Sequence, residues 1–278
     1  MIHVVDEKMG GGKSSALINM MNKADGDTKF LFVTPYLKEV DRVKKSCPTK
    51  NFKEPIGSEE FRYSKLRGLK ILLGKGQNIA TTHALFHYFD DEVLDLIYNN
   101  NYILVLDEVA NVIMPYLKQS TKNKGQGITQ SDLDSLLKCY ATINEETGFL
   151  EWTDDSYDGN QNPYKIDCKM NSLALYGTGR YPLWVFPHKI FDAFKECYIL
   201  TYMFDHQIQK YYFDMFGLKY DFMGVYKING EYRLGEVVNK APTVDYRQLI
   251  HICEKEKLNR IGGNKTDLSK AWYSRNRN

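Results

Sequence analysis

Short apolar runs alternate with amphipathic stretches over most of the chain. The apolar runs are rich in β-branched and aromatic residues and have the length of strands, whereas the stretches between them suit helices. This alternation predicts an α/β fold with a mainly parallel sheet and helices on both of its faces. The predicted strands are 2–6, 29–35, 77–83, 102–106, 183–186 and 197–201, and the predicted helices are 13 to about 26, 36–46, 90–98, 188–194 and 207–216.

The alternation breaks down twice. Residues 119–132 are polar and contain glycine, which indicates a long loop, and segments 148–152 and 164–168 resemble the strands of an antiparallel hairpin. Near the end, the dipeptide Asn229-Gly230 predicts the turn of another β-hairpin. The expected domains are residues 1–220 with an insertion at about 115–175, and a β-containing C-terminal extension over 221–278 with a polar, basic tail.

Composition places the chain among soluble globular proteins. Its 278 residues are 43% hydrophobic and 26% charged, with a net charge of +2, which excludes disordered, collagen-like and coiled-coil classes. Neither a membrane-length apolar run nor a secretory signal is evident, so we expect no membrane partner and a cytoplasmic location, the host cytoplasm if a phage encodes the chain. The 5 cysteines include no Cys-x-x-Cys pair, so we expect buried thiols rather than a zinc site.

The small net charge hides an uneven distribution. Residues 36–75 carry eleven Lys and Arg against five Asp and Glu, so this segment is a candidate surface for contacting phosphates. Residues 145–158 carry six acids and no base, and they should face away from a nucleic-acid backbone. A solvated surface is the alternative interpretation of each run.

A glycine run follows the first predicted strand and leads into a predicted helix. Gly10, Gly11 and Gly12 would let backbone N–H groups converge on phosphate oxygens, and the helix would present its positive end. In this pattern Lys13 reaches the β- and γ-phosphates, the Ser14 hydroxyl binds magnesium, and the nucleotide site extends over residues 10–15, to Ser15. A glycine turn with a chance lysine is the alternative.

The loop departs from the full P-loop pattern at one position. Glu7 stands where that pattern has its first glycine. A carboxylate there should point outward, because otherwise it would repel the phosphates of the nucleotide.

Two adjacent acids end another predicted strand. Four apolar residues, 103–106, precede Asp107 and Glu108, and the carboxyl end of a parallel strand faces the same edge as the glycine loop. Asp107 would hold magnesium, and Glu108 would orient or deprotonate the attacking water. An acidic pair at the start of a helix is the alternative. Together the two motifs predict a site that binds ATP with Mg²⁺.

These motifs carry a family resemblance. Asp107-Glu108-Val109-Ala110 resembles a DEAD/DEAH-type box, and residues 9–15 with 19–22 are similar to the phosphate loop and first helix of phage superfamily 2 helicase-like proteins. The resemblance implies the first RecA-like P-loop NTPase domain of such helicases. It further implies nucleic-acid contacts at two strand ends and a threonine that couples nucleotide state to nucleic-acid grip. The nucleic-acid contacts are Thr34, Pro35, Thr81, Thr82 and His83, and the coupling residue is Thr201.

The same resemblance indicates what the chain lacks. A complete helicase has a second RecA-like domain whose arginines complete the ATP site, and the residues after Thr201 are too few for one. Arg180, flanked by glycine, is the candidate arginine finger in cis; otherwise a second subunit or another protein supplies the missing half.

We therefore expect a nucleic-acid-associated, helicase-like ATPase of phage replication or DNA processing, with DNA as the expected nucleic acid. Three alternatives stay open. A terminase-like ATPase has the same motifs but normally also a nuclease domain. A thymidine kinase has a similar loop but usually a zinc site. The third alternative is a module that binds nucleotide without turnover because of Glu7.

Overall fold

The computed structural model describes residues 1–57, 64–117, 127–178, 180–237 and 269–275. The chain divides into two units, Met1–Val237 and Val238–Asn278. In the second unit the described part is helix α11 (Lys270–Arg275). The first unit includes the β-hairpin that follows residue 220, because that hairpin is hydrogen-bonded into the central sheet.

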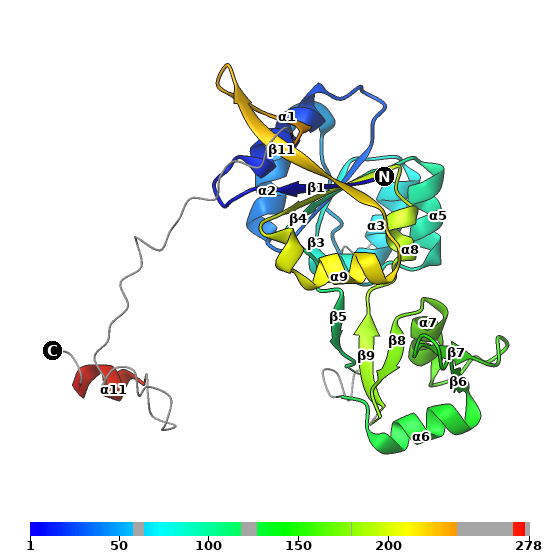
Figure 1. The fold of residues 1–278 in the computed structure, drawn as a ribbon. Coiled ribbons are helices and arrows are strands. Elements are labelled where there is room, and N and C mark those ends of the chain that lie inside the picture. The colour runs from blue at the N-terminus through cyan, green and yellow to red at the C-terminus, as the bar shows by residue number, and fades with distance from the viewer. Residues whose placement is uncertain (58–63, 118–126, 179, 238–268, 276–278) are drawn as a thin grey trace. The chain divides into compact units, whose positions relative to one another are not determined.

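Seven strands form the central sheet of the first unit (Figure 1). Their order is β12-β11-β1-β10-β4-β2-β3, and every neighbouring pair is parallel except β11 with β12. The fold is therefore mixed α/β with a mostly parallel sheet, as the alternation predicted. The strands are β1 (Ile2–Asp6), β2 (Phe30–Thr34), β3 (Ile79–Thr82), β4 (Ile103–Asp107), β10 (Glu196–Thr201), β11 (Tyr220–Ile228) and β12 (Glu231–Glu236).

Helices cover both faces of this sheet. Helices α1 (Lys13–Lys23) and α2 (Leu37–Ser46) pack on one face, where Val5, Phe32 and Val105 are buried. The helices on the other face are α3 (Lys65–Gly74), α4 (His83–Phe86), α5 (Asp91–Asn99), α8 (Lys189–Asp192) and α9 (Ile208–Met215). Short 3₁₀ helices occur at Pro48–Lys50 and Phe204–His206.

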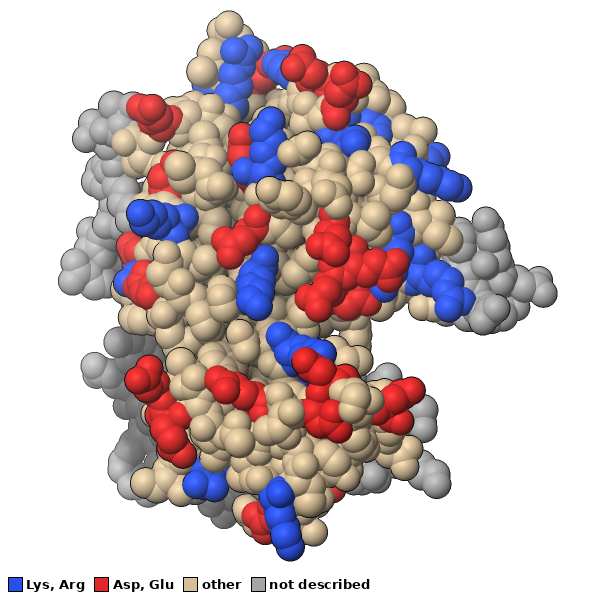
Figure 2. Space-filling view, turned by 90° about the vertical axis from the view of Figure 1, so that its right-hand side faces the viewer, with Lys and Arg blue, Asp and Glu red and all other residues tan. Residues whose placement is uncertain are grey.

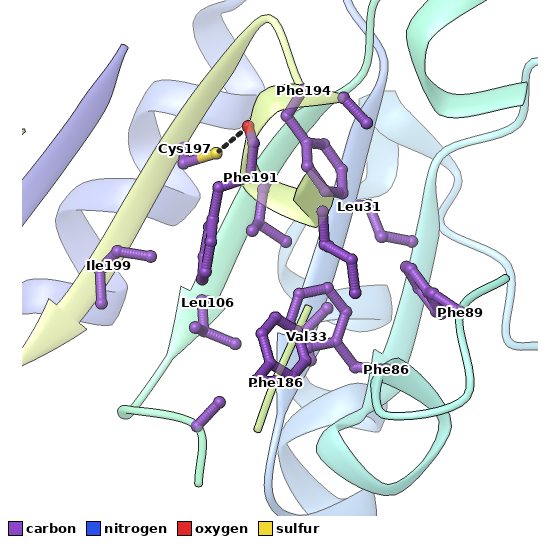
Figure 3. Close-up of a cluster of buried hydrophobic side chains, with 14 of the residues drawn as sticks. Leu31, Val33, Phe86, Phe89, Leu106, Phe186, Phe191, Phe194, Cys197 and Ile199 are labelled. Atoms are coloured by element: carbon purple, nitrogen blue, oxygen red, sulfur yellow. Dashed lines mark hydrogen bonds between the residues drawn. The ribbon is translucent and has the colours of Figure 1, made fainter. Parts of the chain in front are cut away.

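The core under the second face is rich in aromatic side chains (Figure 3). Phe86 lies between Phe89 and Phe186, with ring centroids 4.9 and 5.1 Å away, and Leu31 and Leu106 extend from the sheet into this cluster. Burying one such side chain contributes about 1.5–3 kcal/mol, so this cluster fixes the strands whose ends form the site. None of the helices in the described ranges has the length and apolar composition of a membrane-crossing segment.

The insertion forms two small sheets with a core of their own. Strands β5 (Ile113–Pro115), β8 (Leu173–Tyr176) and β9 (Tyr181–Val185) make an antiparallel sheet in the order β5-β9-β8. Strand β6 (Ala141–Ile143) pairs with β7 (Leu150–Trp152). Helices α6 (Gln130–Cys139) and α7 (Asn162–Lys169) complete the insertion, and its core includes Tyr116, Leu133, Leu150, Cys168 and Leu173.

Three sequence predictions within the insertion are wrong. The predicted strand 183–186 is β9, which pairs antiparallel with β5 and β8 instead of joining the central sheet. The predicted hairpin partner of 148–152 is helix α7, which begins at Asn162 and has a proline in its first turn, and β7 pairs with β6 instead. The predicted loop 119–132 lies partly outside the described residues, but its last part is already helix α6. That helix is capped by the Thr129 hydroxyl and the Asp132 carboxylate, which each accept a backbone N–H of the other residue.

Candidate functional site

The glycine loop joins β1 to α1 at the carboxyl edge of the sheet. Gly10 and Gly12 have φ of +74° and +89°, a region that glycine adopts without the strain of a side chain. No side chain in the described ranges caps the first turn of α1, which contains Lys13, Ser14 and Ser15, so its N–H groups are available to an anion.

Lys13 folds over the loop that precedes it. Its Nζ donates to the carbonyl oxygens of Glu7 and Lys8, the latter at 3.1 Å. Burial lowers the pKa of Lys13, and the nearby carboxylates of Glu7 and Asp107 oppose this shift. The ammonium group is therefore held between the glycine loop and the acidic strand end.

Glu7 does not point outward, which corrects the expectation from sequence. Its carboxylate accepts the N–H of Lys8 at 2.9 Å, and a Cβ added to Gly11 would collide with its side chain. The Lys8 amide and the nearby Lys13 ammonium both attract the carboxylate, which explains why it folds inward. The carboxylate of Glu7 therefore places a negative charge beside the loop whose N–H groups the phosphate-loop interpretation gives to a nucleotide.

The two predicted motifs meet across the sheet edge. The Ser14 hydroxyl donates to Asp107 Oδ1 at 3.4 Å, although 93 positions separate these residues. Burial raises the pKa of Asp107 to about 6, and the negative charges of Glu39 and Glu108 add to the shift. A hydroxyl and a carboxylate are oxygen ligands of the kind that Mg²⁺ prefers, so Ser14 and Asp107 are the residues that would hold a magnesium ion here.

Glu108 has an unusual backbone conformation. Its φ is +66°, in the left-handed region, which costs a residue other than glycine about 1–3 kcal/mol. The N–H of Glu108 donates to the carbonyl of Leu200 on β10 at 3.0 Å, and its side chain is exposed. The strained backbone turns the chain at the end of β4 and leaves the carboxylate beside Asp107, open to solvent.

The residues predicted to contact nucleic acid lie at the same edge but differ in exposure. Thr34 and Thr81 are buried, whereas Pro35, Thr82 and His83 are half-buried. The His83 ring nitrogen Nε2 is 3.0 Å from the carbonyl oxygen of Asp107, and burial lowers the pKa of His83. His83 therefore contacts the acidic strand end directly.

Several basic side chains of segment 36–75 are paired with acids. Lys70 lies 2.7 Å from Asp90 and 2.5 Å from Glu92, and Arg42 lies 2.6 Å from Glu39. On the face shown in Figure 2, acidic and basic side chains are interspersed. The local excess of basic residues in the sequence therefore overstates the free positive charge of this segment.

Strand β10 separates β1 from β4 and carries Thr201 at its end. Thr201 is buried; its hydroxyl donates to Gln207 Oε1 at 2.9 Å, and its carbonyl accepts the N–H of Glu7 at 3.1 Å. The sequence interpretation missed Asp6, whose carboxylate accepts the N–H groups of Met203 and Phe204 at 2.8 and 3.1 Å. Its signal was an acid at the end of the first strand.

Arg180 lies elsewhere in the first unit. It is in the turn between β8 and β9 with φ of +47°, and it lines a cavity of the insertion together with Pro115, Tyr116 and Gln130. These neighbours all belong to the insertion, so the described contacts do not bring Arg180 to Lys13 or Asp107.

Comparison with known proteins identifies a prophage relative. The chain is similar to the SPbeta prophage-derived uncharacterized protein YonV of Bacillus subtilis strain 168, with 38% identity over 286 residues. The match covers 99% of this chain and 67% of the relative. No protein-family model matches the chain, and no solved structure matches it.

Proposed function

The chain belongs to the family of the prophage protein YonV, and we propose that it is a RecA-like, helicase-like P-loop ATPase that acts on nucleic acid. The observation that carries the proposal is the hydrogen bond between Ser14, at the start of α1, and Asp107, at the end of β4. This hydrogen bond brings together two motifs that are separate in the sequence, which supports the proposal of a shared site. The position of β10 between the strands of these motifs supports the same assignment.

Each residue of the site has a definite part in the proposed hydrolysis of ATP to ADP and phosphate. Lys13 would release the loop carbonyls and bind the β- and γ-phosphates, and the N–H groups of the glycine loop would bind phosphate oxygens. Ser14 and Asp107 would hold Mg²⁺, which neutralises charge on the phosphates when bound. The exposed Glu108 would orient the attacking water and accept its proton.

The proposed nucleic-acid surface is the carboxyl edge of β2 and β3. Tyr36 and Leu37 follow β2 and are 62% and 56% exposed, and Lys38 beside them is also exposed. An aromatic ring beside a cation suits stacking on bases and contact with phosphates, and DNA is the nucleic acid we propose. Binding should weaken steeply as salt rises.

ATP hydrolysis with and without single-stranded DNA tests both parts of the proposal. We expect stimulation by DNA, and loss of at least about 100-fold in turnover for Lys13→Ala and Glu108→Gln. Lys195→Ala is the matched control, because Lys195 is exposed near the amino end of β10, at the opposite edge of the sheet. Hydrolysis that survives both site substitutions would refute the assignment.

The inward position of Glu7 favours one second candidate, a nucleotide-binding module without turnover. Calorimetry with ATP, together with an assay of phosphate release, separates the two: binding of ATP without release of phosphate, with or without DNA, would favour the module.

A further inference from the structure

The aromatic side chain of Tyr232, near the C-terminal end of the first unit in sequence, packs on the glycine loop. Tyr232 is the second residue of β12, and a Cβ added to Gly12 would collide with atoms Cγ, Cδ1 and Cε1 of its ring. The ring therefore packs directly on the Gly12 backbone. Tyr232 is half-buried, so the protein does not enclose it completely.

The hairpin that carries this ring is fixed along α1. Asn19 on α1 donates to the carbonyl of Tyr232 at 3.0 Å, and Lys23 at the end of α1 lies 2.6 Å from Glu231. Lys227, which pairs with Tyr232 across the hairpin, has its Nζ 5.6 Å from the centre of the Tyr232 ring. The contacts of α1 with Glu231 and Tyr232 thus hold the Tyr232 ring beside the loop, and the Lys227 ammonium lies over that ring.

The strand order gives the bound nucleotide a direction, if the proposed function holds. β1 lies between β10 and β11, and Asp107 and Glu108 lie beyond β10, at the end of β4. The magnesium ion and the terminal phosphate belong on that side, so the nucleoside end of the triphosphate must extend toward the β11–β12 side. Tyr232 is the aromatic residue that packs on the loop there.

We propose that Tyr232 forms one wall of a nucleobase subsite and that the β11–β12 hairpin holds the nucleoside end of the bound triphosphate. Any nucleobase can stack on an aromatic ring, whatever its pattern of hydrogen-bond donors and acceptors. The subsite therefore favours nucleotides over inorganic polyphosphate but does not select one base over another. Lys227, whose Nζ lies over the Tyr232 ring, adds positive charge beside this subsite.

Affinities for ATP and for inorganic tripolyphosphate, both with Mg²⁺, test the subsite separately from the phosphate loop. Tyr232→Leu keeps an apolar side chain on Gly12 but removes the ring. We expect it to weaken ATP binding about ten-fold, as for loss of one base stack, and to change tripolyphosphate binding less than about two-fold. Tyr232→Phe should retain ATP affinity. Tyr226→Leu is the matched control on the same hairpin, because its ring packs against Gly224 and Gly235 instead of the loop.

Each other outcome has a distinct meaning. Equal weakening of ATP and tripolyphosphate by Tyr232→Leu would show that Tyr232 only supports the loop and would overturn the subsite. Unchanged ATP binding would also overturn it. A wild-type chain that binds neither ligand would refute the proposed phosphate site itself. Thermal unfolding of each variant verifies that it is folded.

Discussion

Glu7 stands where the P-loop pattern has its first glycine. Replacing Glu7 with an uncharged residue should strengthen nucleotide binding. Glu7→Gln keeps the shape of the side chain, and its amide oxygen can still accept the Lys8 N–H, which now bonds to the carboxylate at 2.9 Å. The substitution removes only the negative charge. Glu7→Gly restores the pattern, and no backbone reason opposes it, since Glu7 is not among the residues with positive φ.

The size of the effect follows from charge and hydrogen bonding. Two unit charges about 6 Å apart repel by roughly 3 kcal/mol at an effective dielectric constant of about 20. Lys13 lies close to Glu7 and offsets part of this repulsion. We therefore expect a net gain of about 1–2 kcal/mol, which is a 5- to 30-fold lower Kd for ATP.

Calorimetric titration of ATP with Mg²⁺ at low salt measures this gain. Glu146→Gln is the control, because Glu146 is an exposed acid of the insertion and not part of the loop. The gain should shrink at high salt, since salt screens the repulsion. An unchanged or weakened affinity in Glu7→Gln would refute the idea that Glu7 competes with phosphate.

Three further predictions concern stability. Burial raises the pKa of Asp107 from 3.8 to about 6, so the folded chain keeps a proton that the unfolded chain has lost between these values, and stability falls as pH rises through this window. Asp107→Asn should raise the free energy of unfolding, measured in urea, by roughly 2 kcal/mol above pH 6 and should change it little at pH 4. An equal change in the free energy of unfolding at the two pH values would contradict this explanation. Gly12→Ala should lower the melting temperature more than Gly10→Ala, because both have positive φ but only Gly12 would meet the Tyr232 ring; equal losses would count against that contact. Tyr116→Phe removes the hydroxyl that donates to the Asp167 carboxylate and should cost about 1–3 kcal/mol in urea unfolding, whereas no loss would mean that Asp167 is otherwise satisfied.

Strands β2 and β4 of the central sheet were predictable because they are continuous apolar runs, whereas β11 and β12 mix polar and apolar residues and were assigned to a separate extension. Strands β2 and β4 are buried along almost their whole length, and such strands differ in sequence from the amphipathic helices that follow them. The turn at Asn229 and Gly230 was also predictable, since both residues have positive φ, as a two-residue hairpin turn requires. Local chemistry determines these features.

Helices α3 and α7 have local sequence signals other than apolar periodicity. Helix α3 is capped by the Ser64 hydroxyl, which accepts the N–H of Arg67 at 3.3 Å, and Leu69 and Leu73 share its buried face. Helix α7 has a proline in its first turn, a common first residue of helices. Residues that favour helix starts, in addition to apolar spacing, therefore indicate these two helices.

The meeting of the two motifs was inferred from the rule that parallel strands end at one edge of a sheet and from the family resemblance, since no local pattern determines strand order. The position of β10 between β1 and β4 depends on pairing between segments far apart in sequence. The packing of Tyr232 on Gly12 is of the same kind, because it joins residues 220 positions apart. Sequence patterns predict the strand ends, and the order of the sheet decides which of them become neighbours.

Strand β10 connects the two halves of the proposed site through backbone hydrogen bonds. The carbonyl of Leu200 accepts the N–H of Glu108, and the carbonyl of the next residue, Thr201, accepts the N–H of Glu7. A shift of Glu108 out of its left-handed conformation would therefore disturb Leu200. The neighbour of Leu200, Thr201, is bonded to Glu7 at the start of the glycine loop. Because the Thr201 hydroxyl also donates to Gln207, which precedes α9, the same strand end joins both motifs to a helix on the opposite face from α1. A conformational change caused by nucleotide binding could pass from the site to α9 through these hydrogen bonds. This is a physical reason to test Thr201 for the coupling role that the resemblance implies.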